Sequence, residues 1–207
     1  SIAHRVSEAD RFSRAGKYHA WGPQMLLGTD VMGKTLGIIG LGRFGSQVAH
    51  FAVKGFGMKV IYTDQKPNAA FESEYGAQFV ATPEELLPHA DFVSIHVPLL
   101  ESTRHLINEA RLNMMRSTAY LINTSRGPII DEVALAQALS QGRIRGAAID
   151  VYEFEPKITP ALLELDNIIL TPHIASATQE TRNAMSLLAA QNIIEALEGR
   201  TPPNLVQ

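Results

Sequence analysis

The sequence predicts an α/β protein with a doubly wound parallel sheet, because short apolar runs alternate with longer segments of helical periodicity. The apolar runs are nearly continuous, which is typical of parallel strands that helices cover on both faces. We expect strands at residues 35–40, 59–64, 92–97, 119–124, 146–151 and 167–172, with a weaker edge strand at 76–81.

Helical patterns fill the gaps between these strands. Residues 82–90 open with a capping box and with proline at the first helical position. Further helices are expected at residues 131–142 and at 176–199, the latter with a capping box completed by Gln179. The helix after the first strand, residues 43–56, is expected to bury one apolar face. That face consists of Phe44, Val48, Phe51 and Ala52.

The composition excludes several classes of protein. The chain has 207 residues, of which 45% are hydrophobic and 19% charged, as in ordinary globular proteins. Its formal charge of −3 does not suggest binding to nucleic acid or to an anionic membrane. It has no cysteine, which rules out disulfides and thiolate sites, and no apolar run long enough to span a membrane. We therefore expect a cytoplasmic protein without a metal site.

A glycine-rich loop follows the first strand and opens the first helix of the sheet. The stretch "GIIGLGRFG" has the pattern G-x-G-x-x-G at Gly40, Gly42 and Gly45. Gly40 permits a tight turn, Gly42 lets the backbone approach a pyrophosphate, and Gly45 lets the helix pack closely on the strand. Arg43 lies between them and can add positive charge to the phosphate site. The pattern therefore predicts a dinucleotide-binding domain of the Rossmann type.

The second strand ends in Asp64. A carboxylate at this position accepts hydrogen bonds from a ribose diol and repels a 2′-phosphate, which favours NAD over NADP. Lys66 follows closely and leaves the use of NADP open.

Three strand ends bring candidate catalytic residues to one edge of the sheet. The segments "LINTSRG", "AIDVYEFEP" and "ILTPHIAS" place Arg126, Glu155 and His173 where the nicotinamide of a dinucleotide would lie. This set suits the reduction of a 2-oxo acid: Arg126 would bind the substrate carboxylate, and His173 would give a proton to the carbonyl oxygen. Glu155 would orient the imidazole and keep it protonated. His96 also lies at the end of a strand. It either lines the cofactor cleft or has only a packing role, and the sequence leaves both alternatives open.

These segments resemble the D-isomer-specific 2-hydroxyacid dehydrogenases over essentially the whole chain. The resemblance is carried by "GKTLGIIGLGRFGSQVA", "DFVSIHVPLLESTRHLIN", "LINTSRGPIIDEVALAQAL", "GAAIDVYEFEP" and "NIILTPHIASAT". It implies that Arg126 is the substrate arginine, Glu155 the partner of the histidine, and His173 the acid–base. It also implies that Asp150 binds the nicotinamide carboxamide. The cofactor contacts that it implies are Gly40, Gly42, Arg43, Phe44, Gly45, Asp64, Val97, Pro98, Thr103, Thr124, Asp150 and Ala175.

Within this family the C-terminal part looks most like the glyoxylate and hydroxypyruvate reductases. The resemblance implies hydride transfer between NAD(P)H and a small 2-oxo acid, which gives the D-2-hydroxy acid, in a homodimer. Two alternatives stay open. One is a phosphoglycerate dehydrogenase, which shares the core motifs. The other is an NAD-sensing scaffold similar to the corepressors called C-terminal binding proteins.

The family also implies a second, smaller domain that closes over the cofactor and is largely absent from these residues. We accordingly interpret residues 1–15 as part of the interdomain helix and residues 16–179 as the NAD-binding domain. Residues 180–207 would form a C-terminal helix and tail that return toward the substrate domain. We expect this stretch to keep the cofactor site and the three catalytic residues but to lose most turnover without domain closure.

Overall fold

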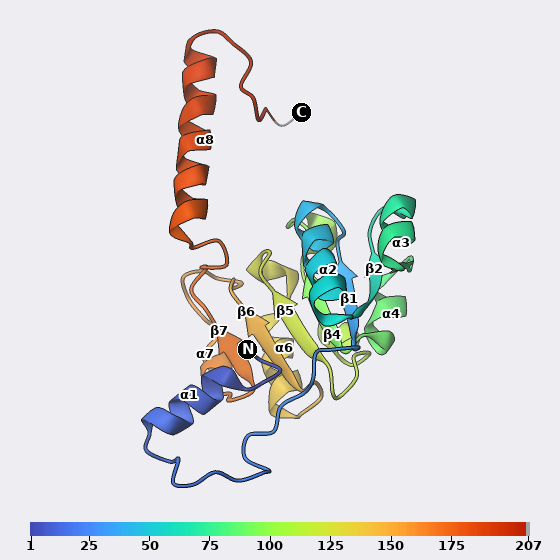
Figure 1. The fold of residues 1–207 in the computed structure, drawn as a ribbon, viewed down its shortest axis with the longest axis vertical. Coiled ribbons are helices and arrows are strands. Elements are labelled where there is room, and N and C mark those ends of the chain that lie inside the picture. The colour runs from blue at the N-terminus through green and yellow to red at the C-terminus, as the bar shows by residue number, and fades with distance from the viewer. Residues whose placement is uncertain (206–207) are drawn as a thin grey trace. The chain divides into compact units, whose positions relative to one another are not determined.

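The computed structural model describes residues 1–205, which divide into two compact units (Figure 1). One unit comprises residues 1–172 and the other begins at His173, and each is described by itself. A single sheet forms the centre of the first unit. Its strands are β1 (Thr35–Ile39), β2 (Lys59–Thr63), β3 (Gln78–Phe79), β4 (Phe92–Ile95), β5 (Tyr120–Asn123), β6 (Gly146–Ile149) and β7 (Ile168–Leu170). All neighbours pair in parallel in the order β3-β2-β1-β4-β5-β6-β7, which confirms the predicted doubly wound sheet.

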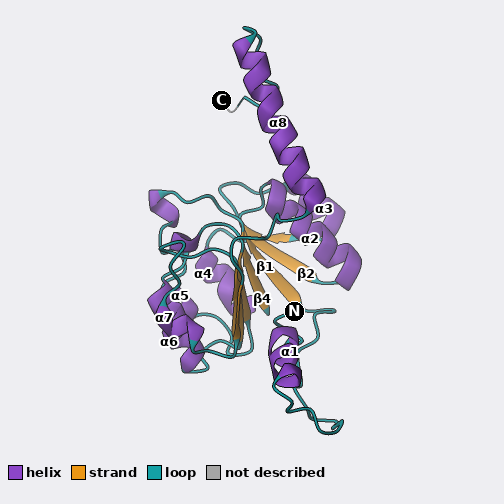
Figure 2. Cartoon of the chain, turned by 90° about the vertical axis from the view of Figure 1, so that its left-hand side faces the viewer, coloured by secondary structure: helices purple, strands orange, loops and turns teal. Residues whose placement is uncertain are grey.

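Helices cover both faces of this sheet. Those of the first unit are α1 (Val6–Arg14), α2 (Arg43–Phe56), α3 (Ala69–Tyr75), α4 (Pro83–Leu86), α5 (Glu109–Leu112), α6 (Glu132–Ser140) and α7 (Pro160–Leu163). Figure 2 shows α2 and α3 on one side of the sheet and α4 to α7 on the other. The second unit contains α8 (Gln179–Leu197). No helix of residues 1–205 is both long and apolar enough to cross a membrane.

Two clusters of buried side chains lie on opposite faces of the sheet. Adjacent residues of β1 belong to different clusters: Ile38 packs with residues of α2 and α3, whereas Ile39 packs with residues of α4 to α7. Successive side chains of a strand point to opposite faces, so a strand that is buried on both faces needs a nearly continuous apolar run. This is why the strands were recognisable in the sequence.

The face of α2 that packs on the sheet differs from the predicted one. Phe44 and Phe51 are 81% and 60% exposed, and Val48 is also exposed, so of the predicted face only Ala52 is buried. The buried residues of this helix are Gly45, Ala49 and Ala52. Small side chains let the helix lie close to the strands. The close approach at the glycine loop therefore selects this face, and the larger apolar residues remain outside.

The predicted helix starts are confirmed for α2, α4 and α6 and wrong for α8. Thr82 and Asp131 are the N-caps of α4 and α6, since each side chain accepts a hydrogen bond from the backbone N–H three residues on. By contrast, α8 begins at Gln179 rather than at Ser176, and Gln179 completes no capping box. The hydroxyl of Thr178 accepts a hydrogen bond from the first turn and sets the start of the helix there.

Candidate active site

The candidate site lies at the carboxyl edge of the sheet. Because all strands run the same way, the residues that follow them gather at this edge. The chain leaves β1 for β2 on one side and later enters β4 on the other, so the order of the strands reverses beside β1. Such a reversal is where open α/β sheets bind ligands. Directly after the strands come Gly40, Asp64, His96, Thr124 and Asp150.

The glycine loop has the geometry of a phosphate cradle. Gly40 has a φ of 94°, and a Cβ there would lie 2.8 Å from Val97 Cγ1, so only glycine fits without strain. A Cβ on Gly45 would overlap the carbonyl oxygen of Gly40, which confirms the predicted close packing of α2 on β1. Gly42 is the N-cap of α2, and a Cβ there would meet nothing within 4 Å. Backbone N–H groups at this open helix N-terminus, next to the exposed Arg43, suit a pyrophosphate.

Asp64 is fixed beside this loop. Its two carboxylate oxygens accept hydrogen bonds from Leu41 N (2.7 Å) and Gln65 N (2.6 Å). Together with Lys66 and residues 67–69 these groups line a depression of about 500 Å³. A carboxylate held here suits a ribose diol, so the residues after β1 and β2 fit the adenosine half of a dinucleotide.

The loop that carries Arg126 is held by a buried amide. Asn123 is 0% exposed, its Nδ2 donates to Arg126 O (2.9 Å), and its Oδ1 accepts from Ser125 N (2.9 Å). Ser125 Oγ donates to Val97 O (2.5 Å), which ties this loop to the one after β4. The backbone of Arg126 is therefore ordered while its side chain is exposed to the edge of the sheet. Asn123 and Ser125 were not predicted. The signal was present as polar residues at the end of an apolar run.

The loop that carries Glu155 contacts the Arg126 loop. A Cβ on Gly127 would overlap the backbone carbonyl of Tyr152, so the two chain segments lie in direct backbone contact. Glu155 Oε1 accepts a hydrogen bond from Tyr152 N (3.1 Å), and its peptide bond to Pro156 is cis. Two predicted catalytic residues of the first unit, Arg126 and Glu155, thus stand on adjoining loops.

The other predicted contacts fall on the same edge. Thr103 Oγ1 donates to Pro98 O (2.7 Å) and accepts from Leu100 N (2.7 Å), so this hydroxyl shapes the loop after β4. Asp150 is only 4% exposed, and its carboxylate accepts a hydrogen bond from Thr171 Oγ1 (2.5 Å). Their contact with a cofactor remains a prediction.

His173 and Ala175 belong to the second unit. His173 has a φ of 55°, in the left-handed region that few residues other than glycine adopt. Strained backbone of this kind is common at functional sites, which suggests a function for this position. Its meeting with Arg126 and Glu155 remains a prediction.

His96 is partly buried at the end of β4, where its Nε2 lies 2.8 Å from Ser94 Oγ. Burial lowers the pKa of His96 from 6.5 to about 4, so its imidazole is neutral near pH 7. It therefore adds no positive charge to the site at that pH.

This burial makes the stability of the domain dependent on pH. Between pH 6.5 and 4 the unfolded chain binds a proton at His96 and the folded chain does not, so stability falls as the pH is lowered. We expect His96 to contribute up to roughly 3 kcal/mol of this loss at pH 4. Urea unfolding of wild type and His96→Asn across this range should show a smaller loss in the variant. The exposed His89, changed to Asn, is the control; equal losses in all three proteins would contradict the prediction.

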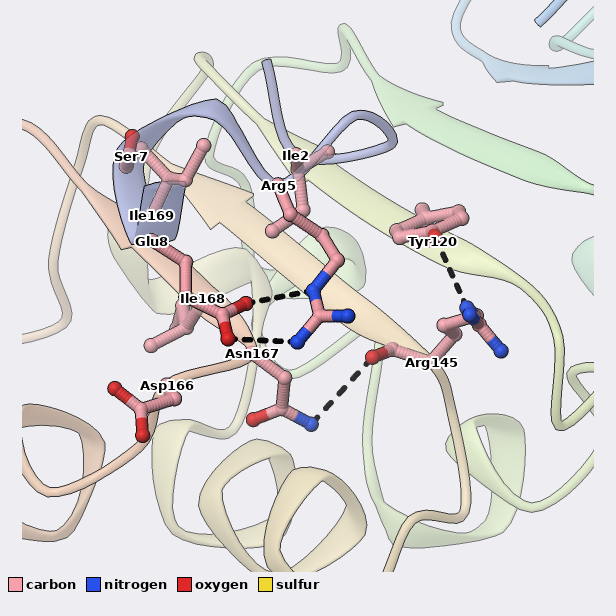
Figure 3. Close-up of a pocket in the computed structure, with 10 residues that line it drawn as sticks. All are labelled: Ile2, Arg5, Ser7, Glu8, Tyr120, Arg145, Asp166, Asn167, Ile168 and Ile169. Carbon is pink, nitrogen blue, oxygen red and sulfur yellow. Dashed lines mark hydrogen bonds and ion pairs between the residues drawn. The ribbon is translucent and has the colours of Figure 1, made fainter. Parts of the chain in front are cut away.

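A second depression, of about 300 Å³, lies at the opposite, amino edge of the sheet (Figure 3). It is bordered by the paired side chains of Arg5 and Glu8 (2.6 Å) and by Arg145, whose Nε donates to Tyr120 OH (3.2 Å). None of the predicted site residues lines it. Within residues 1–205 no group of three or more histidine or acidic side chains could hold a metal ion.

Comparison with known proteins assigns this geometry to a family. Residues 1–175 match the NAD-binding domain of the D-isomer specific 2-hydroxyacid dehydrogenases. The chain belongs to this family. The predicted family and the predicted cofactor, NAD, are thereby confirmed. Contact of the glycine loop and Asp64 with this cofactor remains a prediction, which their geometry favours.

Individual relatives and solved structures match the whole chain. A glyoxylate reductase of Korarchaeum cryptofilum is 52% identical over 209 residues, which cover 100% of this chain and 62% of the relative. A solved structure from Thermus thermophilus is 42% identical with a TM-score of 0.92, and covers 100% of this chain and 64% of that one. The NAD-complexed D-isomer specific 2-hydroxyacid dehydrogenase of Lactobacillus delbrueckii is 30% identical with a TM-score of 0.84 (100% and 66% covered). The chain thus spans less than two thirds of the relatives' length.

Proposed function

We propose that this domain serves an NADH-dependent reductase of small 2-oxo acids such as glyoxylate or hydroxypyruvate, which gives the D-2-hydroxy acid. The observation that carries the proposal is the direct backbone contact between the loops of Arg126 and Glu155, at the same edge of the sheet as the glycine loop. The glyoxylate reductases among the relatives support this choice of substrate.

In the proposed reaction the bound cofactor supplies a hydride to the carbonyl carbon. The guanidinium of Arg126 binds the substrate carboxylate through charge-assisted hydrogen bonds and orients the carbonyl. His173 holds a proton and donates it to the carbonyl oxygen, which would otherwise become an alkoxide. Glu155 orients the imidazole and stabilises its protonated form. Each of these steps uses a side chain that the chain itself carries.

The remaining assignments follow from the same proposal. Residues 1–15 form part of an interdomain helix, and residues 16–179 form the NAD-binding domain. Residues 180–205 form a segment that returns toward a substrate domain, which is largely absent from this chain. The last two residues of the predicted segment, 206 and 207, lie outside the described residues. The protein acts as a cytoplasmic homodimer, and the domain alone turns over slowly because closure excludes water from the reacting atoms.

The test is the loss of NADH absorbance with glyoxylate, hydroxypyruvate and phosphohydroxypyruvate in turn. It is run first on the chain itself, at protein concentrations high enough to detect slow turnover. It is then repeated on the chain joined to the part of the Korarchaeum cryptofilum relative that this chain does not cover. We expect slow reduction of the first two acids by the chain and rapid reduction by the joined protein.

Three other outcomes would change the assignment. Preference for phosphohydroxypyruvate would favour a phosphoglycerate dehydrogenase. NADH binding without reduction by either protein would contradict a reductase and favour the NAD-sensing scaffold. Rapid reduction by the chain alone would show that closure by a second domain is not needed.

A further inference from the structure

A buried carboxylate next to the Glu155 loop has no place in the proposed chemistry. Glu132, the first residue of α6, is 1% exposed. Burying a carboxylate costs several kcal/mol unless hydrogen bonds or a counter-charge compensate. No ion pair of Glu132 is found among residues 1–205, although the first turn of a helix favours a negative charge. Its hydrogen bonds must therefore supply most of the compensation.

Those hydrogen bonds go to the two ends of one loop. Glu132 Oε1 accepts from Glu153 N (2.6 Å), and Oε2 accepts from Thr159 Oγ1 (2.5 Å). Glu155 lies between these two anchor points. One buried side chain thus holds both ends of the segment that presents the proposed partner of the histidine.

Other restraints on this loop are a hydrogen bond within it, from Lys157 N to Phe154 O (2.9 Å), and two contacts that reach only its first end. His105 Nε2 lies 2.7 Å from Glu153 Oε1, and the His105 side chain is 39% exposed. The backbone contact with Gly127 reaches Tyr152 and Glu153 but does not reach Thr159. Glu155 itself is exposed, and it accepts its hydrogen bond from Tyr152 N next to one end of this loop, so its position depends on how the ends of the loop are held.

We propose that Glu132 is a positioning residue of the reductase, which aims Glu155 by fixing residues 153–159. The proposal rests on the proposed function. The contacts also specify what Glu132 must supply, namely one acceptor for Glu153 N and one partner for the Thr159 hydroxyl. A glutamine meets both needs, because its oxygen accepts and its amide donates to Thr159 Oγ1. Shape and hydrogen bonding are needed here, and charge is not.

The experiment compares Glu132→Ala and Glu132→Gln in whichever form of the protein reduces glyoxylate. The chain itself can be used if its slow turnover is measurable. We expect Glu132→Ala to lower kcat roughly 10- to 100-fold, because a misplaced orienting group costs about this much. Glu132→Gln should stay within about threefold of wild type, and NADH affinity should change less than about twofold in both. Glu109→Ala, which removes an exposed acid from the first turn of α5, is the matched control.

A double-mutant cycle separates positioning from general stability. If Glu132 acts through Glu155, Glu132→Ala should have little further effect on kcat in a Glu155→Gln background. The proposal would be overturned if the two substitutions lowered kcat by the product of their separate effects, or if Glu132→Gln were as slow as Glu132→Ala. If Glu155→Gln alone leaves kcat unchanged, the proposed function fails instead.

A second variant covers the case in which Glu132→Ala does not fold. Thr159→Val removes one of the two loop contacts, and Thr159, although it is the N-cap of α7, makes no side-chain cap there. We expect a several-fold lower kcat, again without further effect beside Glu155→Gln, together with faster amide exchange at residues near Thr159. An unchanged kcat with faster exchange would overturn the proposal.

Discussion

Replacing His173 by alanine is expected to lower the rate of 2-oxo acid reduction roughly 10²- to 10⁴-fold, the usual contribution of a general acid. Without the imidazole, the carbonyl oxygen must take its proton from water as the hydride arrives. The side chain is exposed in the second unit, so its loss leaves no cavity in the core. The measurement is the steady-state oxidation of NADH with glyoxylate, together with the dissociation constant of NADH from its fluorescence. That constant should change less than about twofold.

The matched control for this variant is His89→Ala. His89 is also exposed, but it lies before β4, at the amino edge of the sheet. His89→Ala should leave both the rate of 2-oxo acid reduction and the affinity for NADH unchanged. If His173→Ala retained the wild-type rate, the predicted set of Arg126, Glu155 and His173 would have no catalytic role, and the chain would be an NAD-binding domain alone.

Replacing Gly45 by alanine is expected to destabilise the first unit by about 2–4 kcal/mol and to weaken NADH binding at least about tenfold. The new Cβ would overlap the carbonyl oxygen of Gly40, which is backbone and cannot swing aside. The N-terminus of α2 would have to move away from β1, and the phosphate cradle would move with it. Thermal melting followed by circular dichroism and NADH fluorescence titration report the two effects.

Gly55→Ala tests whether the loss of stability and of NADH binding is caused by the close approach of Gly45 to Gly40. Gly55 lies in the same helix, and a Cβ there would meet nothing within 4 Å. Alanine should therefore leave NADH binding unchanged and stabilise the protein by up to about 1 kcal/mol, from helix propensity alone. If Gly45→Ala behaved like Gly55→Ala, the close packing at the glycine loop would not be needed for the cofactor site.

The geometry of the glycine loop and the place of Asp64 could be predicted because their signals are local. Gly40, Gly42, Gly45 and Asp64 belong to one continuous strand–turn–helix–strand stretch, and this stretch itself requires glycine at Gly40 and Gly45. Their geometry in the structure agrees with the prediction. The buried face of α2 is the exception. Apolar periodicity favoured Phe44 and Phe51, whereas contact with the sheet requires small residues.

The support of the catalytic loops could not be predicted, because it depends on residues far apart in the sequence. Ser125 meets Val97 across 28 residues, and Glu132 meets Glu153 and Thr159 across 21 and 27. No periodicity or spacing relates such pairs. Glu132 in particular looks like an ordinary first-turn acid of a helix, and only its burial distinguishes it.

The sequence by itself determined the alternation of strands and helices, the parallel sheet and the dinucleotide fingerprint. Burial on both faces demands continuous apolar runs, and a tight turn before a closely packed helix demands glycine. Only the tertiary structure decided which face of α2 is buried and which buried polar groups hold the Arg126 and Glu155 loops. These depend on which loops come to adjoin at the carboxyl edge, and a buried polar group must take its partner from whatever segment the fold places beside it.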